Sequence, residues 1–223
     1  MLIHRPGRPQ DLPDPEEMWA RWALAAVLCA TSEREGQRSG LSGWWLDAAR
    51  GGLRMDDRGC TWWALWRWGE GRFVLCGWDE SGELIGFEPP VDMFAGAPQW
   101  LSPSRLEELV DPFQFGCVYW YEHGRWSRAS YPDELWDDGL DIGLNSALDL
   151  EAAADLRRID VARLKADIEE LNRAATHFRV TERQLRAFAD RAVASGASSL
   201  DVPAMLRALD ASGLGKGAET ETG

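Results

Sequence analysis

The stretch Thr61 to Trp68 has the sequence TWWALWRW and carries the strongest strand pattern of this chain. Successive side chains of a β-strand point to opposite faces, so every second residue of the stretch shares a side. One side then carries Trp62, Ala64, Trp66 and Trp68, and the other carries Trp63, Leu65 and Arg67. This alternation predicts a strand at the centre of an antiparallel sheet.

Turn residues that follow this strand in the sequence predict that it is part of a sheet. Gly69-Glu70-Gly71 and residues 80–83 read as tight turns, and His123-Gly124 reads as a third. Connections this short favour antiparallel neighbours over parallel crossovers. With Thr61 to Trp68 the pattern predicts about five strands, the others being Arg72 to Asp79, Leu84 to Glu88, Phe115 to Glu122 and Arg125 to Ser130.

Helical signals precede and interrupt these strands. Asp14 as N-cap, Pro15 as first helical residue and Glu17 three positions after the cap predict a helix that continues through Met18 to Ala30. Ser102-Pro103 predicts a second helix through about Val110. Leu41 to Arg50 is predicted as a short helix that Gly51-Gly52 ends.

From Leu144 onward the composition shifts to helix-forming residues. Apolar residues at 3.6-residue spacing predict one long amphipathic helix from Ser146 to Phe178. Thr181 with Gln184 predicts a further helix that ends at Gly196, and Asp201 caps a last one through Leu209. The stripe of the long helix comprises Leu156, Ile159, Leu164, Ile168, Leu171, Ala175 and Phe178.

The predicted fold class is therefore α+β, with an antiparallel sheet of about five strands flanked by helices and followed by an α-helical C-terminal subdomain. The predicted division is a flexible arm at residues 1–13, an acidic Trp-rich domain at 14–143, a helical subdomain at 144–212 and a disordered tail at 213–223.

Composition narrows the classes of function. The chain of 223 residues contains 37 acidic residues against 24 Lys and Arg, a formal net charge of −13, which argues against non-specific binding to nucleic acid or anionic lipid. No signal peptide and no apolar run of about 20 residues are visible. The four cysteines, Cys29, Cys60, Cys76 and Cys117, form no Cys-x-x-Cys pair and indicate free thiols in a reducing cytoplasm.

The acidity is concentrated in the Trp-rich part of the chain. Residues 1–143 carry 24 acidic residues and 13 arginines, a net charge of −11, whereas residues 144–223 have a net charge of −2. The loop from Asp133 to Gly143 contains five carboxylates within nine residues. It lacks the alternating order of a calcium loop, so a solvated acidic surface is the favoured interpretation over a cation site.

Aromatic and acidic residues interleave around this loop outside the regular strands, a combination that suits an interface with a basic protein. Reversing Asp137 and Asp138 to arginine is expected to slow association without unfolding the protein. The predicted partner-binding residues are Trp126, Tyr131, Trp136, Asp137, Asp138 and Asp141.

No catalytic or cofactor motif is present, so no catalytic residue, metal ligand or cofactor is assigned. His123 reads as a turn residue beside Gly124. Two alternatives stay open. One is a metal- or carboxylate-dependent hydrolase, including a carbohydrate-directed one, that uses the acidic loop with His123. The other is an assembly role in which the helix at 146–178 forms a homodimer.

Three stretches carry a resemblance: Met93 to Leu101 (MFAGAPQWL), Tyr119 to Trp126 (YWYEHGRW) and Tyr131 to Leu140 (YPDELWDDGL). Over residues from about 60 to 143, they make the chain resemble a group of uncharacterised acidic, Trp-rich actinobacterial proteins. The resemblance implies a bacterial source and no particular activity. In general character the chain is also similar to immunity proteins that neutralise toxins, including the SUKH type, which is an analogy at the level of fold and charge.

The sequence thus predicts a non-enzymatic, cytoplasmic protein-binding module, of the kind that an immunity protein or antitoxin uses to inhibit a basic toxin or nuclease. The expected partner is a basic protein, with no direct contact to nucleic acid or membrane.

Overall fold

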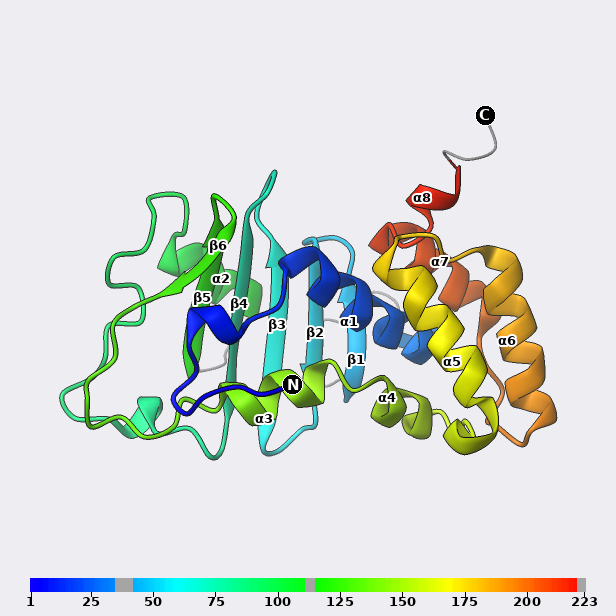
Figure 1. Cartoon of the computed structure of the whole chain (residues 1–223), viewed down its shortest axis with the longest axis horizontal. Coiled ribbons are helices and arrows are strands. Elements are labelled where there is room, and N and C mark those ends of the chain that lie inside the picture. The colour runs from blue at the N-terminus through cyan, green and yellow to red at the C-terminus, as the bar shows by residue number, and fades with distance from the viewer. Residues whose placement is uncertain (35–41, 111–114, 220–223) are drawn as a thin grey trace. The chain divides into compact units, whose positions relative to one another are not determined.

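A computed structural model describes residues 1–34, 42–110 and 115–219, and Figure 1 shows the course of the chain. Six strands form one sheet and follow one another in chain order. The pairs from β2 to β6 are antiparallel. The strands are β1 (Gly43–Asp47), β2 (Gly52–Asp56), β3 (Thr61–Arg67), β4 (Phe73–Asp79), β5 (Cys117–Glu122) and β6 (Arg125–Arg128). The fold is therefore α+β, as predicted, with one strand more than expected.

By its internal contacts the chain divides into two compact units, which are described separately. Unit 1 consists of Met1–Pro15 and Arg50–Ala147, and unit 2 consists of Glu16–Ala49 and Leu148–Gly223. Both units are discontinuous in sequence, unlike the consecutive domains predicted from composition. The segment Glu16–Ala49 belongs with the C-terminal helices rather than with the Trp-rich strands.

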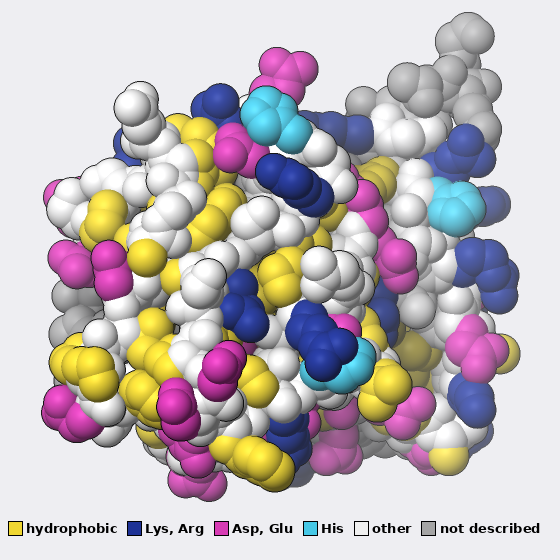
Figure 2. Space-filling view, turned by 60° about the vertical axis from the view of Figure 1, so that its left-hand side comes forward, with side chains coloured by type: hydrophobic (Ala, Val, Ile, Leu, Met, Phe, Trp, Pro, Cys, Tyr) yellow, Lys and Arg dark blue, Asp and Glu magenta, His cyan; other side chains and the backbone are white. Residues whose placement is uncertain are grey.

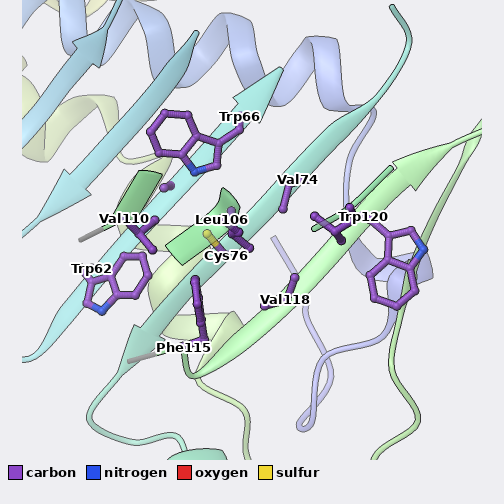
Figure 3. Packing of buried hydrophobic residues seen from close by; sticks show 11 residues of the cluster. Trp62, Trp66, Val74, Cys76, Leu106, Val110, Phe115, Val118 and Trp120 are labelled. Atoms are coloured by element: carbon purple, nitrogen blue, oxygen red, sulfur yellow. The ribbon is translucent and has the colours of Figure 1, made fainter. Parts of the chain in front are cut away.

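In unit 1, helix α2 (Pro103–Val110) covers one face of the sheet. Leu106 and Val110 of this helix pack against alternate residues of β3, β4 and β5, as Figure 3 shows. The β3 residues on this face include Trp62, Ala64 and Trp66, and Trp68 packs at the margin of the same cluster. The alternation predicted for Thr61 to Trp68 is thereby confirmed.

The opposite face of this sheet is covered by helix α3 (Leu140–Ala147), which contacts β3 and β4. Trp63, from the other side of β3, lies directly under Gly143 of α3, and a Cβ atom at residue 143 would overlap its indole ring. Both faces of β3 are therefore buried, and its Trp62 and Trp63 side chains belong to different layers of the core.

Unit 2 contains strand β1 and a set of helices, of which α1 (Pro15–Cys29) is the most deeply buried. Between Met18 and Cys29 every residue of α1 except Arg21 is buried, as expected for a helix that is apolar on all sides. Trp19 donates from Nε1 to the carbonyl oxygen of Ser212 at 3.1 Å. The other helices are α4 (Leu150–Leu156), α5 (Val161–Thr176), α6 (Glu182–Ala194), α7 (Val202–Ser212) and α8 (Lys216–Glu219).

Three short 3₁₀ helices complete the described secondary structure, namely η1 (Pro9–Asp11), η2 (Ser32–Arg34) and η3 (Leu84–Gly86). The last of these corrects the strand predicted over Leu84 to Glu88. No helix in the described ranges is both long enough and apolar enough to cross a membrane.

The predicted helix over Leu41 to Arg50 is also wrong, although Leu41 itself lies outside the described residues. Strand β1 occupies Gly43–Asp47 of this stretch, and the glycines expected to end a helix instead lead into β2. Gly52 pairs with Trp66 of β3, and a Cβ atom at residue 52 would overlap that indole ring. The glycine therefore makes room for a cross-strand tryptophan. A short apolar run such as Trp44-Trp45-Leu46 does not by itself distinguish strand from helix.

The single long helix predicted over residues 146–178 is divided into the end of α3, α4 and α5. Asp149 caps α4 by accepting a hydrogen bond from the Ala152 amide, and Asp160 caps α5 by accepting one from Arg163. Arg158 between them has a positive φ of 55°. Leu164, Ile168, Leu171 and Ala175 of the predicted stripe are buried in α5, whereas Leu156 of α4 is 46% exposed. The continuous helix on which homodimerisation was expected to depend is not formed.

The two ends of the chain are more ordered than predicted. Ile3, Gly7 and Leu12 of the arm at residues 1–13 are buried, and η1 lies within the arm. In the predicted tail, Leu214 is buried and helix α8 follows it. Residues 220–223 of that predicted tail lie outside the described part of the chain.

Candidate functional site

The six residues predicted to bind a partner separate into a buried polar centre and an exposed surface. Trp126 lies in β6, Tyr131 follows β6, and Trp136, Asp137 and Asp138 lie in the loop before α3. Asp141 is in the first turn of α3. All six belong to unit 1.

Asp138 is the centre of the buried group and is only 1% exposed. Its Oδ1 accepts hydrogen bonds from the amide nitrogens of Gly7 at 2.9 Å and Leu140 at 3.3 Å. Its Oδ2 accepts a hydrogen bond from the hydroxyl of Tyr119 at 2.7 Å. Burial raises the pKa of Tyr119 well above its ordinary value, so this hydroxyl keeps its proton and acts as the donor. Asp138 thus joins the arm, β5 and α3.

Arg5 of the arm is seated on two further carboxyl groups. Its Nε and Nη2 each lie 2.6 Å from Asp141 Oδ2, and its Nη1 lies 3.5 Å from Asp137 Oδ2. Asp137 Oδ1 also accepts a hydrogen bond from the Gly139 amide at 2.7 Å. Burial is the main cause that raises the pKa of Asp137, while the Gly139 hydrogen bond and the charge of Arg5 oppose the shift.

Two aromatic residues from the β6 region are linked to the arm, Trp126 directly and Tyr131 through Arg128. Trp126 donates from Nε1 to the carbonyl oxygen of Pro13 at 2.8 Å and is 8% exposed. Arg128 donates from Nε to the carbonyl oxygen of Gly7 at 3.0 Å, and its guanidinium carbon lies 3.6 Å from the ring centroid of Tyr131. Trp126 and Tyr131 therefore lie where the arm is fastened.

These contacts correct two expectations. The arm is not a flexible extension, because its backbone supplies donors and acceptors to buried side chains. The acidic loop is not solvated throughout, because Asp137 and Asp138 are buried. Arginine at either position would place an additional cation in this buried group, so charge reversal there is expected to disrupt folding rather than to report on binding.

Trp136 differs from the other five residues because its side chain is 76% exposed. Its amide nitrogen donates to Glu83 Oε2 at 3.1 Å, and the amide of Glu83 in turn donates to the carbonyl oxygen of Asp137 at 3.0 Å. The two loops are thus side by side, and Trp136 lies beside the Glu83 carboxyl group, with the exposed acids Asp133 and Glu134 close by in sequence. We call this group the Trp136 surface; its exposed members are Glu83, Ile85, Asp133, Glu134 and Trp136.

Figure 2 shows one face of the molecule, on which hydrophobic side chains reach the surface in separate patches with acidic and basic side chains between them. An exposed tryptophan among acids suits a contact that is both apolar and electrostatic.

Metal and hydrolase chemistry find little support in the geometry. Within the described ranges, no three His, Cys, Asp or Glu side chains are grouped so that they could hold a metal ion. Of the loop carboxyls, those of Asp137, Asp138 and Asp141 contact Arg5 or Gly7, whereas Asp133 and Glu134 are exposed. His123 lies in the β5–β6 turn with a φ of 52°, as expected for a turn residue, and its side chain is 85% exposed.

Two hollows occur elsewhere in the described structure. A groove of about 400 Å³ runs between the arm and the β5–β6 hairpin, with Pro9, Pro13, Tyr121 and Trp126 among its lining residues. A second hollow of about 330 Å³ lies between α5 and α6, where Asp167 forms an ion pair with Arg191. Neither contains a carboxyl group of the acidic loop.

Sequence reasoning missed the residues that complete the site. Arg5 and Gly7 lie in the arm that was predicted to be flexible, and Glu83 was predicted to lie in a hairpin turn. Tyr119 offered a weak signal, since it is a polar-tipped residue within an apolar strand and such residues generally find a partner when buried.

Comparison of the chain with protein-family models, with curated proteins and with solved structures finds no match. The function is therefore inferred from the side chains of the chain itself.

Proposed function

We propose that this chain is a non-enzymatic module that binds a basic protein partner, in the manner of an immunity protein or antitoxin that neutralises a basic toxin or nuclease. The observation that carries the proposal is the exposure of Trp136 beside Glu83, with Asp133 and Glu134 close by in sequence. Exposed tryptophan is a frequent energetic centre of protein interfaces, and carboxylates around it favour a cationic partner.

The charge of the whole chain supports the same proposal. A formal charge of −13 creates a field that attracts basic proteins and speeds their association. The Trp136 surface offers an apolar anchor within that field. The four free cysteines fit a reducing compartment, so we place this interaction in a bacterial cytoplasm.

The proposal can be tested by replacing Trp136 with a benzophenone amino acid and irradiating the protein in cells of its native host. Val193 of α6, which is 50% exposed and lies in unit 2, is the matched control position. The expected result is a covalent product with a basic protein from position 136 and not from position 193.

The electrostatic part of the proposal has its own control. Glu83→Gln with Glu134→Gln in the crosslinking protein should reduce the yield of that product, because the partner is attracted to these charges. Identical products from positions 136 and 193, or no specific product from position 136, would contradict the proposal.

A further inference from the structure

The arm places a positive charge on a pair of acids that adjoins the Trp136 surface. Arg5 contacts both Asp141 and Asp137. The side chains of these two acids are 17% and 7% exposed, whereas that of Arg5 is 48% exposed. The acids therefore form a largely buried receptor, and the guanidinium group that occupies it lies at the surface.

Arg5 can leave this receptor without unfastening the whole arm. The deep anchor of the arm is Gly7, whose amide donates to Asp138 and whose carbonyl oxygen accepts from Arg128. The side chain of Leu2 is 85% exposed. Opening of the first five residues exposes Ile3 and breaks the exposed contacts of His4 with Asp11 and of the Met1 amino group with Asn145, but it leaves the buried hydrogen bond of Gly7 to Asp138 in place.

We infer that the Asp137–Asp141 pair is the receptor for an arginine of the basic partner, and that Arg5 occupies it in the free protein as an intramolecular stand-in. This inference rests on the proposed function. Trp136 directly precedes Asp137, so the aromatic anchor and the guanidinium receptor are consecutive along the loop. A partner segment that covers Trp136 would bring its own arginine to the receptor.

The receptor favours arginine over lysine. Two guanidinium nitrogens of Arg5 approach one carboxyl group while a third faces the other. A planar guanidinium supplies several donors in a fixed arrangement, which an ammonium group lacks. Because Arg5 competes for the same oxygen atoms, its removal strengthens binding of an external arginine.

The test uses a fluorescently labelled hexa-arginine peptide and the full-length protein, with binding followed by fluorescence anisotropy. Arg5→Ala should bind the peptide about three- to tenfold more tightly than the wild type, because the receptor is no longer occupied. Asp141→Asn in the Arg5→Ala background should abolish that gain. A hexa-lysine peptide should gain less than hexa-arginine.

Arg8→Ala is the matched control. It removes the same charge from the same arm, and Arg8 is an exposed residue with no ion pair among the described residues. An equal gain from Arg8→Ala and Arg5→Ala would show an effect of net charge alone and would overturn the inference. An unchanged affinity in Arg5→Ala would overturn it as well.

Hydrogen–deuterium exchange of the wild-type protein provides a second test that needs no substitution. Excess hexa-arginine should speed exchange at the amides of Ile3, His4 and Arg5, while the Gly7 amide stays protected by Asp138. Unaltered exchange over these three residues at a peptide concentration that saturates binding would contradict displacement of the arm.

Failure of this inference can be distinguished from failure of the proposed function. If wild-type protein binds the peptide and Trp136→Ala weakens that binding, while Arg5→Ala gains nothing, the Trp136 surface stands and the receptor does not. If neither wild type nor Arg5→Ala binds, both the inference and the preference for a basic partner are overturned.

Discussion

The amide nitrogen of Gly7 donates to Asp138 Oδ1 at 2.9 Å, which joins two residues that are 131 positions apart in the sequence. The same carboxyl group accepts from Tyr119, so one buried side chain connects the arm, the sheet and the loop before α3. Trp136 lies in that loop, two residues before Asp138. The buried centre is therefore the support that fixes the exposed surface.

Tyr119→Phe tests this support. It removes the hydroxyl that donates to Asp138 Oδ2 and also lies 2.9 Å from the carbonyl oxygen of Gly7. A buried carboxyl oxygen then lacks its donor, which should lower the free energy of unfolding by about 1–3 kcal/mol in urea denaturation. Tyr121→Phe is the control, since the described residues provide no hydrogen bond to that hydroxyl, and it should change stability by less than about 0.5 kcal/mol. Equal effects of the two substitutions would refute a supporting role for Tyr119.

Gly143→Ala tests the contact between α3 and the sheet. A Cβ atom at this position would overlap the indole of Trp63, which is itself fully buried. Overpacking of this kind should cost about 1–3 kcal/mol and lower the thermal midpoint. Gly59→Ala is the matched control, because a Cβ atom there meets nothing within 4 Å. A Gly143→Ala protein as stable as the Gly59→Ala protein would contradict the packing described.

Ser32 and Asp201 predict an acid-dependent contact in unit 2. The amide and the hydroxyl of Ser32 each donate to Asp201 Oδ2 at 2.7 Å, and together with the Ala204 amide they lower the pKa of Asp201 from 3.8 to about 2. Because the folded value lies below the unfolded one, the stabilisation is present above pH 3.8 and is lost as pH falls through about 2.

Ser32→Ala should therefore raise the pKa of Asp201 towards its ordinary value, since the hydroxyl hydrogen bond is the largest cause of the shift. A carbon-13 NMR titration of the side-chain carboxyl group measures this directly. Ser130→Ala, at an exposed position in unit 1, should leave the titration unchanged. A Ser32→Ala protein that titrates as the wild type does would show that Ser32 is not the cause.

Thiol reactivity separates Cys60 from the other three cysteines. Cys60 is exposed, whereas Cys29, Cys76 and Cys117 are buried, and burial raises the pKa of Cys76 to about 12. A hydrogen bond to Glu80 is the main cause that raises the pKa of Cys60, so its thiolate is scarce and its reaction is slow. Mass spectrometry after treatment with a maleimide should find one modified cysteine in the native protein, and Glu80→Gln should speed the modification. Comparable labelling of Cys76 without denaturant would disprove the burial.

Alternation along one strand predicted the two faces of β3, and turn residues predicted the hairpins β3–β4 and β5–β6, whereas β2, which pairs with β3 on its other edge, was not predicted. The sequence pattern failed at β1, where an apolar run of three residues fits a helix or a strand equally well. It also failed between residues 146 and 178, because successive short helices that each face a core imitate one continuous stripe. Asp149 and Asp160, which cap α4 and α5 in the structure, were not recognised as caps in the sequence.

The candidate site was predicted in part, for an identifiable reason. A sequence shows the carboxyl groups of the acidic loop but not their donors, and the donors here include Arg5 and Gly7, which are 136 and 131 positions away from their acceptors in the sequence. Burial of Asp137 and Asp138 could not be deduced because the arm that covers them was predicted to be flexible. Trp136 was among the predicted partner-binding residues and is exposed, yet nothing in its identity distinguishes it from the buried tryptophans of β3.

We propose that the Trp136 surface captures a basic protein by charge and by its exposed ring. The most direct measurement is the association rate of the partner crosslinked at residue 136, for wild type and for Glu83→Gln with Glu134→Gln, at low and at physiological salt. The variant should associate several-fold more slowly at low salt, with the difference shrinking as salt screens the charges and with an unchanged thermal midpoint. Equal association rates of the two proteins at low salt would contradict the account.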